Sequence, residues 1–278
     1  MAKYDLAWNE EKYNKKIKEG YGQGIGKNYK PWITIHDFPS DGLVSRGPGW
    51  KANRVFHFMS TNELRYFYLL EWCDDITDIR EQFPLELEDT LRIAEKIGIK
   101  HPIDNTSKFP NVLTTDFMIT LNFSGKEVHI ARTIKPFKKL EENRVLEKFE
   151  IERRYWKERG IDWGIVTEND IPKVFAANIE WIHTEYSLEP TEELSVEEQL
   201  DICATLKDRL GKYDSFINRV TSNLDMELNI EKGTSLSLFR HLLARKEVIM
   251  NMLQKISGGS STKDIVSVIT HGNKVKAL

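Results

Sequence analysis

Two segments of the chain, residues 114–121 and 127–135, alternate apolar and polar side chains with the period of two that a β-strand requires. A Ser124-Gly125 pair stands between them, and such a pair is a signal for the tight turn of a hairpin. The pattern predicts an antiparallel hairpin. Because a shift of one residue would move every side chain to the other face, the hairpin constrains whatever packs on it.

The turn also sets which residues face each other across the hairpin. With the turn at Ser124-Gly125, Thr133 lies opposite Asp116, and Lys135 follows two residues later on the same face, about 7 Å away. We therefore expect a carboxylate, a hydroxyl and a lysine to meet at one end of the sheet.

The flanking segments predict the remaining elements of a mixed α/β domain. Residues 60–73 space their apolar side chains as a helix does, and residues 76–83 have the composition of a strand that the following proline ends. Residues 139–159 are predicted to form a long charged helix, and residues 162–167 a further strand.

After residue 168 the pattern changes to short helices, which we expect at about 172–184, 195–211 and 235–245. Residues 248–253 alternate as a strand does. Small helices, one short strand and a basic surface favour a helix-turn-helix or winged-helix module. The sequence thus predicts two domains, residues 1–168 and 169–278.

Composition excludes several classes of protein. Of the 278 residues, 40% are hydrophobic and 30% charged, which is typical of a globular chain and not of a disordered one. No apolar run approaches the roughly 18 residues of a membrane span, and the first residues lack the apolar core of a signal peptide. Cys73 and Cys203 are too distant in sequence for a metal knuckle and fit a reducing compartment. We expect a cytoplasmic protein.

The charges are unevenly distributed along the chain. The total is only −3, which does not indicate a protein that binds DNA by its own charge. Residues 169–231 hold 5 Lys+Arg and 14 Asp+Glu, whereas residues 232–278 hold 8 and 2, and residues 1–60 hold 10 and 6. Local basic surfaces can bind phosphates because charges are screened over about 10 Å. Solvated faces explain the same distribution.

Residues 18–32, KEGYGQGIGKNYKPW, form a glycine-rich, basic and aromatic segment that fits neither the P-loop nor the dinucleotide pattern. Closely spaced glycines allow a partner to approach the backbone. One interpretation is contact with a nucleic-acid backbone, and the other is a plain ordered loop. The side chains available for such contact are Lys27, Tyr29, Lys30 and Trp32.

Glu63, Asp116 and Lys135 together form the pattern of a PD-(D/E)xK nuclease, in which carboxylates bind a divalent metal and a lysine stabilises charge on the phosphate. The pattern is loose, and each member has a plain alternative. Ser60 to Glu63 fit a capping box, with Glu63 reaching back to the Ser60 backbone. Asp116 and Lys135 could be ordinary residues at strand ends.

The chain as a whole resembles the TnsA family, the endonuclease subunits of heteromeric bacterial cut-and-paste transposases. The resemblance is collinear from about residue 10 to residue 185 and weaker beyond. It rests on the blocks KEGYGQGIGKNYKPWITI, LEWCDDITDIREQFPL, IAEKIGIKHP, TTDF, IKP and LEKFEIERRYW.

The resemblance implies a restriction-endonuclease-like N-terminal domain and a winged-helix-like C-terminal domain. It also implies Mg²⁺-dependent cleavage, with Mn²⁺ as a substitute, of the 5′ non-transferred DNA strands at transposon ends. The implied partners are double-stranded DNA, the transposase TnsB and the ATPase TnsC, which the C-terminal part would contact.

The resemblance also implies roles for individual residues. Glu63 and Asp116 are the acidic metal ligands and Lys135 is the active-site lysine, while Glu152 in ERRYW could support the site. The family usually has glutamine where this chain has Thr133. Ligation could come from Thr133 itself, from water, or from the backbone carbonyl of Ile134.

This departure leaves two other functions open. A nuclease fold that has lost catalysis could link TnsB to TnsC as an adaptor, and a free-standing repair or restriction nuclease would share the same fold and metal chemistry. The sequence predicts neither the DNA end recognised nor the route of target selection.

Overall fold

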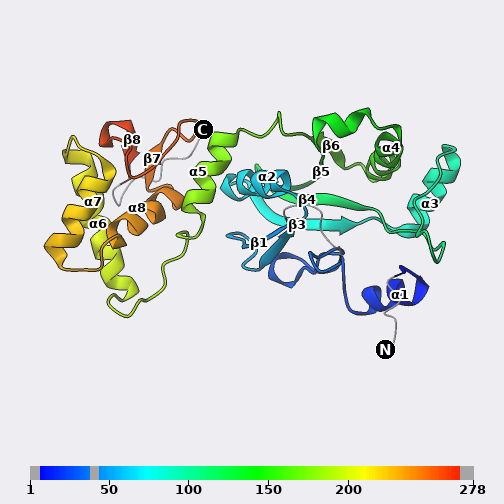
Figure 1. Ribbon diagram of the computed structural model, residues 1–278, viewed down its shortest axis with the longest axis horizontal. Coiled ribbons are helices and arrows are strands. Elements are labelled where there is room, and N and C mark those ends of the chain that lie inside the picture. Colours follow the sequence, from blue (N-terminus) through cyan, green and yellow to red (C-terminus); the bar gives the residue numbers. More distant parts are fainter. Residues whose placement is uncertain (1–6, 38–43, 270–278) are drawn as a thin grey trace. The chain divides into compact units, whose positions relative to one another are not determined.

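The sheet that carries the predicted hairpin has the strand order β3-β4-β5-β6 (Figure 1). In the computed structural model, which describes residues 7–37 and 44–269, these strands are Ile76–Pro84, Thr114–Phe123, Lys126–Ile134 and Asp162–Val166. Neighbouring strands are antiparallel except for β5 and β6, which are parallel.

The hairpin prediction is confirmed. Ser124 and Gly125 have φ values of 52° and 79°, the left-handed conformation that a two-residue turn needs. The register pairs Met118 with Ala131 and ends at Phe117 opposite Arg132. This is the predicted register, but the ladder stops one residue before Asp116 and Thr133, so these two residues do not form a pair within it.

Helices pack around this sheet (Figure 1). The predicted helix at residues 60–73 is α2, Thr61–Trp72. The predicted helix at 139–159 is divided into a 3₁₀ helix, Phe137–Glu141, and α4, Asn143–Glu158. Helix α3, Leu87–Lys96, follows β3 and was not expected. Ile93, Met118, Ile151 and Trp156 belong to the buried core that joins α3, α4 and the sheet.

The N-terminal segment adds α1, Glu10–Lys18, a 3₁₀ turn at Gly26–Asn28, and a small sheet of β1, Ser45–Pro48, and β2, Val55–Phe58. The glycine-rich segment is an ordered loop, and contact of its Lys27 and Lys30 with nucleic acid stays a prediction.

Tyr29 and Trp32 of that loop are buried and are not available to nucleic acid, which corrects the alternative. A Cβ at Gly24 would meet the Asn28 carbonyl oxygen at 2.3 Å, so the loop closes on itself there.

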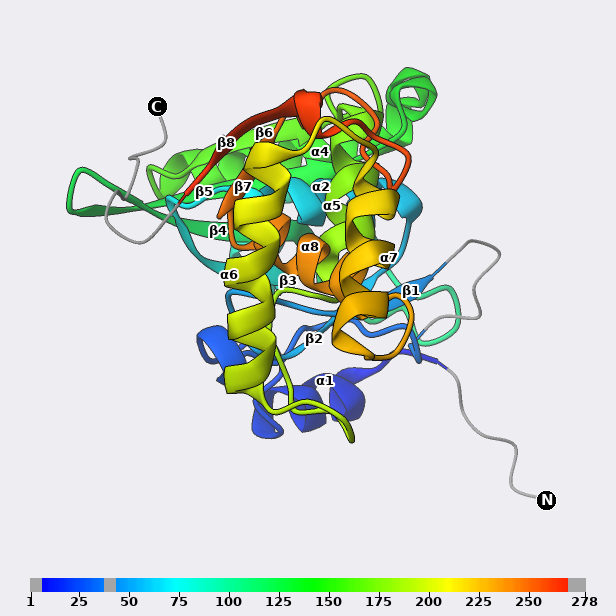
Figure 2. The same cartoon turned by 90° about the vertical axis from the view of Figure 1, so that its left-hand side faces the viewer.

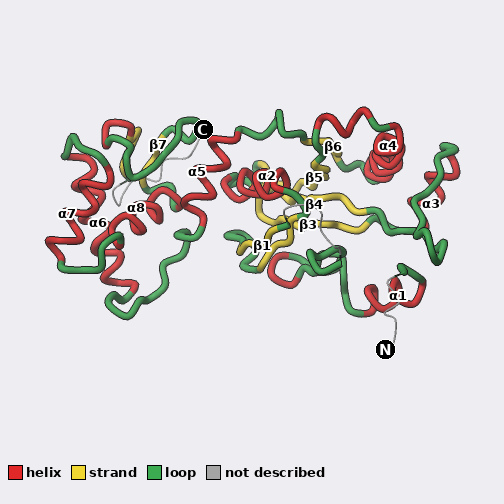
Figure 3. The backbone as a smooth tube through the Cα atoms, in the orientation of Figure 1, coloured by secondary structure: helices red, strands yellow, loops and turns green. Residues whose placement is uncertain are grey.

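The chain divides into two units, residues 1–171 and 172–278. The second is mainly helical, as Figure 3 shows, with α5, Lys173–His183, α6, Val196–Lys212, α7, Ile217–Leu228, and α8, Thr234–Ala244. Helices α6, α7 and α8 contact one another (Figure 2). A two-stranded sheet of β7, Val248–Met250, and β8, Ile265–Val268, completes the unit after a short 3₁₀ turn, Thr262–Asp264.

Three of these helices and strand β7 lie where the sequence predicts them, whereas α7 was not expected. Across the described ranges, no helix has the length and apolar composition needed to cross a membrane.

Candidate active site

Glu63 lies in the first turn of α2, where a helix cap fixes its position. The Ser60 hydroxyl oxygen accepts a hydrogen bond from the Glu63 amide at 3.2 Å, and the hydroxyl donates to Glu63 Oε1 at 2.9 Å. Glu63 Oε2 accepts from the Met59 amide at 2.9 Å. The predicted cap at Ser60 is confirmed, but the carboxylate reaches the Met59 backbone instead of that of Ser60. These bonds hold the carboxylate in a buried position.

Asp116 lies near the start of β4, beyond the end of the β4–β5 ladder. Its Oδ2 accepts a hydrogen bond from the Ile134 amide at 2.7 Å, and its Oδ1 accepts from Gln82 Nε2 at 3.2 Å. The same Gln82 nitrogen lies 3.4 Å from Glu63 Oε2. One amide group therefore joins the two carboxylates, which come from a helix and a strand 53 residues apart in the chain.

Burial and mutual repulsion make this pair unfavourable as two anions. Burial, followed by the negative charge of Asp116, raises the pKa of Glu63 to about 8. Burial likewise raises the pKa of Asp116 to about 6. The positive charge of Lys135 opposes both increases, so this lysine lies within the electrostatic field of the pair. The structure thus brings the three predicted residues together.

Ile134 and Lys135 occupy the end of β5. The Lys135 amide donates to the Val166 carbonyl at 2.9 Å, which fixes this end of β5 to β6. Ile134 directs its amide N–H at Asp116. Because the N–H and C=O of one strand residue point to the same edge, the Ile134 carbonyl also faces the side of β5 on which Asp116 lies.

Thr133 has other partners than Asp116. Its hydroxyl donates to Glu152 Oε1 and lies 3.2 Å from Trp163 Nε1. Glu152 also accepts from the Thr115 hydroxyl at 2.6 Å and from Trp163 Nε1 at 3.0 Å. A role of Thr133 as a metal ligand therefore stays a prediction, and this geometry does not favour it.

Glu152 is buried on α4, and burial raises its pKa to about 7. Its carboxylate accepts hydrogen bonds from Thr115 on β4 and Thr133 on β5, the residues that precede Asp116 and Ile134. Its place is consistent with the supporting role that the resemblance implies.

Gln82 is the site residue that sequence reasoning missed. It is buried in β3, and its φ of 48° is unusual for a residue other than glycine inside a strand. The β3–β4 ladder passes from Glu81 opposite Phe117 to Phe83 opposite Thr115 and omits Gln82. The segment IREQFP carries no local signal of this interruption, because glutamine is not a residue that marks positive φ.

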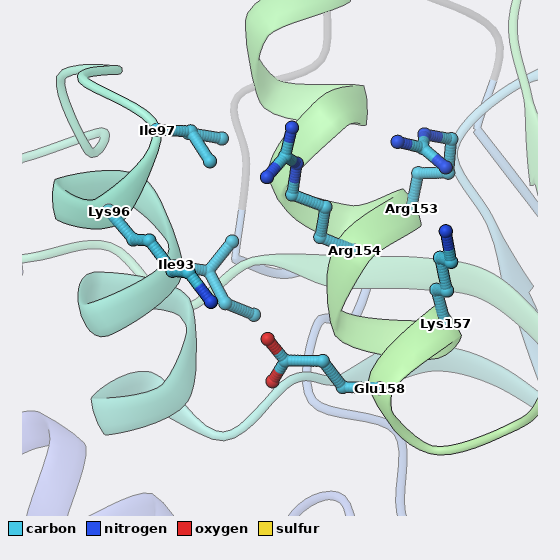
Figure 4. Close-up of a pocket in the computed structure, with 7 residues that line it drawn as sticks. All are labelled: Ile93, Lys96, Ile97, Arg153, Arg154, Lys157 and Glu158. Atoms are coloured by element: carbon cyan, nitrogen blue, oxygen red, sulfur yellow. The ribbon is translucent and has the colours of Figure 1, made fainter.

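A separate cavity of about 360 Å³ lies between α3 and α4 (Figure 4). Four cationic side chains line it together with Ile93, Ile97 and the acidic Glu158. Glu150 forms ion pairs with both arginines, and Glu158 is paired with Arg92. A phosphate oxyanion suits such a cationic surface. The four cations are Lys96, Arg153, Arg154 and Lys157.

The acidic pair fits a hard divalent cation, because two adjacent carboxylates, one buried and one partly buried, gain from a positive charge and offer oxygen donors. The described residues contain no group of three or more His, Cys, Asp or Glu side chains that could hold a metal. Further protein ligands here would be neutral oxygens of backbone carbonyl, amide or hydroxyl groups. Such a site suits phosphodiester hydrolysis better than covalent catalysis.

Comparisons with known proteins agree with the resemblance. Residues 73–168 match the family described as TnsA-like endonuclease N terminal, and residues 170–252 match TnsA endonuclease C terminal. The first match contains Asp116 and Lys135 but begins after Glu63. The chain is also similar to the transposon Tn7 transposition protein TnsA of Escherichia coli, with 37% identity over 276 residues, covering 99% of this chain and 98% of the relative.

Proposed function

The chain belongs to the TnsA family of transposon endonucleases, and from this premise we propose that it is a Mg²⁺-dependent nuclease that cuts the 5′ non-transferred strands at transposon ends. The observation that carries the proposal is the pair of buried Glu63 and partly buried Asp116, joined by Gln82, with Lys135 in its field. Two adjacent carboxylate charges lower the stability of the fold, and a bound cation offsets that loss.

Glu63 and Asp116 are the proposed carboxylate ligands. The Ile134 carbonyl, which faces the side of β5 on which Asp116 lies, is the proposed backbone ligand. Thr133 is retained as a ligand only through an intervening water, because its hydroxyl is engaged with Glu152. A divalent cation, when bound, polarises the scissile phosphate and makes hydroxide available near neutral pH. Lys135 orients the attacking water and stabilises the negative charge that develops on the phosphate.

The finer fold assignments belong to the same proposal. The crossover of α4 between parallel β5 and β6, next to an antiparallel hairpin, supports a restriction-endonuclease-like domain for residues 1–168. Helices followed by the β7–β8 sheet support a winged-helix-like domain for residues 169–278.

The proposed partners are double-stranded DNA at the transposon ends, the transposase TnsB and the ATPase TnsC. A net charge of −3 suits an enzyme that other subunits deliver to its DNA. Within residues 1–171, the cationic cavity between α3 and α4 is the surface that we assign to a DNA phosphate.

One observation favours a second function: the Thr133 hydroxyl donates a hydrogen bond to Glu152 instead of facing the acidic pair. In that case the chain is an adaptor between TnsB and TnsC with a weakened nuclease site. The adaptor predicts no Mg²⁺ or Mn²⁺ binding that depends on Asp116, which titration calorimetry measures directly.

Strand-specific cleavage of an end-labelled transposon end, with TnsB, TnsC and Mg²⁺ present, tests the nuclease. We expect 5′-strand cutting that is lost in Asp116→Ala and Lys135→Ala while assembly with the partners persists. Cleavage by Asp116→Ala would refute the site assignment. Cutting that appears only in Thr133→Gln would establish the adaptor.

A further inference from the structure

The amide of Gln82 lies within hydrogen-bonding distance of both carboxylates. Its Nε2 lies 3.4 Å from Glu63 Oε2 and 3.2 Å from Asp116 Oδ1. An N–H donor between two acceptors reduces their repulsion, as a cation does more strongly. Gln82 is thus in direct contact with both residues that the proposed function assigns to metal.

The backbone is distorted in a way that places this side chain. A φ of 48° is unfavourable for a residue with a Cβ, and the interrupted ladder gives up cross-strand pairing at Gln82 and Asp116. Strain of this kind persists where the surrounding structure holds it, and it concentrates at functional sites. The Gln82 carbonyl, which accepts from the Trp32 amide at 3.2 Å, is one such restraint.

The oxygen of the Gln82 amide is hydrogen-bonded to a hydroxyl group, which can act either as a donor or as an acceptor. Gln82 Oε1 accepts a hydrogen bond from the Thr114 hydroxyl at 3.2 Å. A hydroxyl both donates and accepts, so it can serve an amide oxygen or an amide NH₂ group equally well. The amide can therefore turn over without leaving Thr114 unsatisfied, and it then directs Oε1 at the carboxylates.

We propose that Gln82 is an oxygen ligand of the metal site formed by Glu63 and Asp116, with its NH₂ group holding the carboxylates together in the metal-free protein. The absence of a third acidic or histidine ligand among the described residues leaves a position for such a neutral donor. This inference rests on the proposed function, since it requires that the acidic pair bind metal.

Titration calorimetry of the full chain with Mn²⁺, repeated with Mg²⁺, tests the proposal. Methionine and glutamate are unbranched like glutamine, so Gln82→Met and Gln82→Glu leave the cost of the positive φ unchanged and alter only the terminal group. We expect Gln82→Met to weaken Mn²⁺ binding on the order of 10-fold or more, in the range seen when groups that support a metal site are lost. Gln82→Glu, which restores an oxygen donor, is expected to bind at least as tightly as the wild type.

Gln199→Met is the matched control, because Gln199 is also a buried glutamine whose Nε2 donates a hydrogen bond, at 2.7 Å to the Glu189 carbonyl, but lies in the other unit. It should leave Mn²⁺ affinity unchanged. A folded Gln82→Met that binds Mn²⁺ as the wild type does, with binding still abolished by Asp116→Ala, would overturn the role of Gln82 and leave the nuclease site standing. A wild type without Asp116-dependent binding would overturn both.

Discussion

Replacing Asp116 with asparagine measures how much the acidic pair destabilises the metal-free fold. Asparagine has nearly the same shape and keeps an oxygen that can accept from the Ile134 amide, which donates to Asp116 at 2.7 Å. The substitution removes one of the two buried negative charges. It also places an amide opposite Gln82, so the hydrogen bond from Gln82 Nε2 is weakened.

The magnitude follows from the pKa of the buried acid. Burial raises the pKa of Asp116 from its ordinary 3.8 to about 6. At about 1.4 kcal/mol per pKa unit, full ionisation costs the native state about 3 kcal/mol. An acid with a raised native pKa favours the fold below its ordinary pKa, and this stability is lost as the pH rises through the native pKa. The weakened hydrogen bond costs about 1 kcal/mol at either pH.

At pH 5 the carboxyl is ionised in the unfolded chain but mostly protonated in the native state, so about half of the roughly 3 kcal/mol is already lost there. After the weakened hydrogen bond is subtracted, we therefore expect Asp116→Asn to stabilise the protein by about 2 kcal/mol at pH 8 and by only about 0.5 kcal/mol at pH 5. Urea unfolding in the presence of a chelator, followed by tryptophan fluorescence, measures the difference. Six of the seven tryptophans lie in residues 1–171, so the signal reports mainly on the unit that holds the site.

Asp75→Asn is the control, because Asp75 is exposed in the same unit and its replacement should change stability little at either pH. A loss of stability in Asp116→Asn that is equal at pH 5 and pH 8 would refute the reasoning, since the pair would then carry no electrostatic cost.

Three further predictions concern the support of the site, its metal and its DNA contact. Glu152→Ala should lower the free energy of unfolding by about 2–4 kcal/mol, because the hydrogen-bond donors of Thr115, Thr133 and Trp163 then lose their acceptor. Glu152→Gln should cost less, and equal losses for the two variants in urea unfolding would contradict this. Because metal binds ionised carboxylates, saturating Mg²⁺ should raise the unfolding temperature more at pH 8 than at pH 6, and calorimetry near pH 7 should detect proton release. An equal rise in unfolding temperature at both pH values would count against ligation by Glu63 and Asp116. The double replacement of Lys96 and Lys157 by alanine should weaken the salt dependence of binding to duplex DNA, with the slope of log affinity against log salt smaller by about 1–2. Fluorescence anisotropy measures this slope, and an unchanged slope would show that the cavity does not contact DNA.

The elements that carry the site were predictable because their signals are local. Period-two alternation and Ser124-Gly125 defined the hairpin and its register. The serine before α2 marked the start of the helix that carries Glu63. The approach of Glu63 to Asp116 had no such local signal, and only the resemblance to a family indicated it.

The remainder depended on contacts between distant segments. The burial of Tyr29 and Trp32 follows from packing against β3, where the Tyr29 hydroxyl donates to the Glu81 carbonyl at 3.0 Å. The partners of Thr133 come from α4 and β6, which no hairpin pattern contains. The positive φ of Gln82 is set by its surroundings and has no sequence signature.

Helix α3 is a different case, because its sequence does carry a helical signal. Its buried residues, Leu87, Thr90, Ile93 and Ala94, follow the spacing of a helix that buries one face. This helix was therefore predictable from the sequence, although it was not expected. The structure was needed to show that this segment forms one wall of the cationic cavity.

The central claim is that Glu63 and Asp116 bind one divalent cation between them. Crystals grown with Mn²⁺ and measured at a wavelength where manganese scatters anomalously test it most directly. We predict an anomalous peak within about 2–2.5 Å of an oxygen from each carboxylate, which is lost in crystals of Asp116→Asn. Well-ordered crystals with both carboxylates visible and no peak between them would contradict the account.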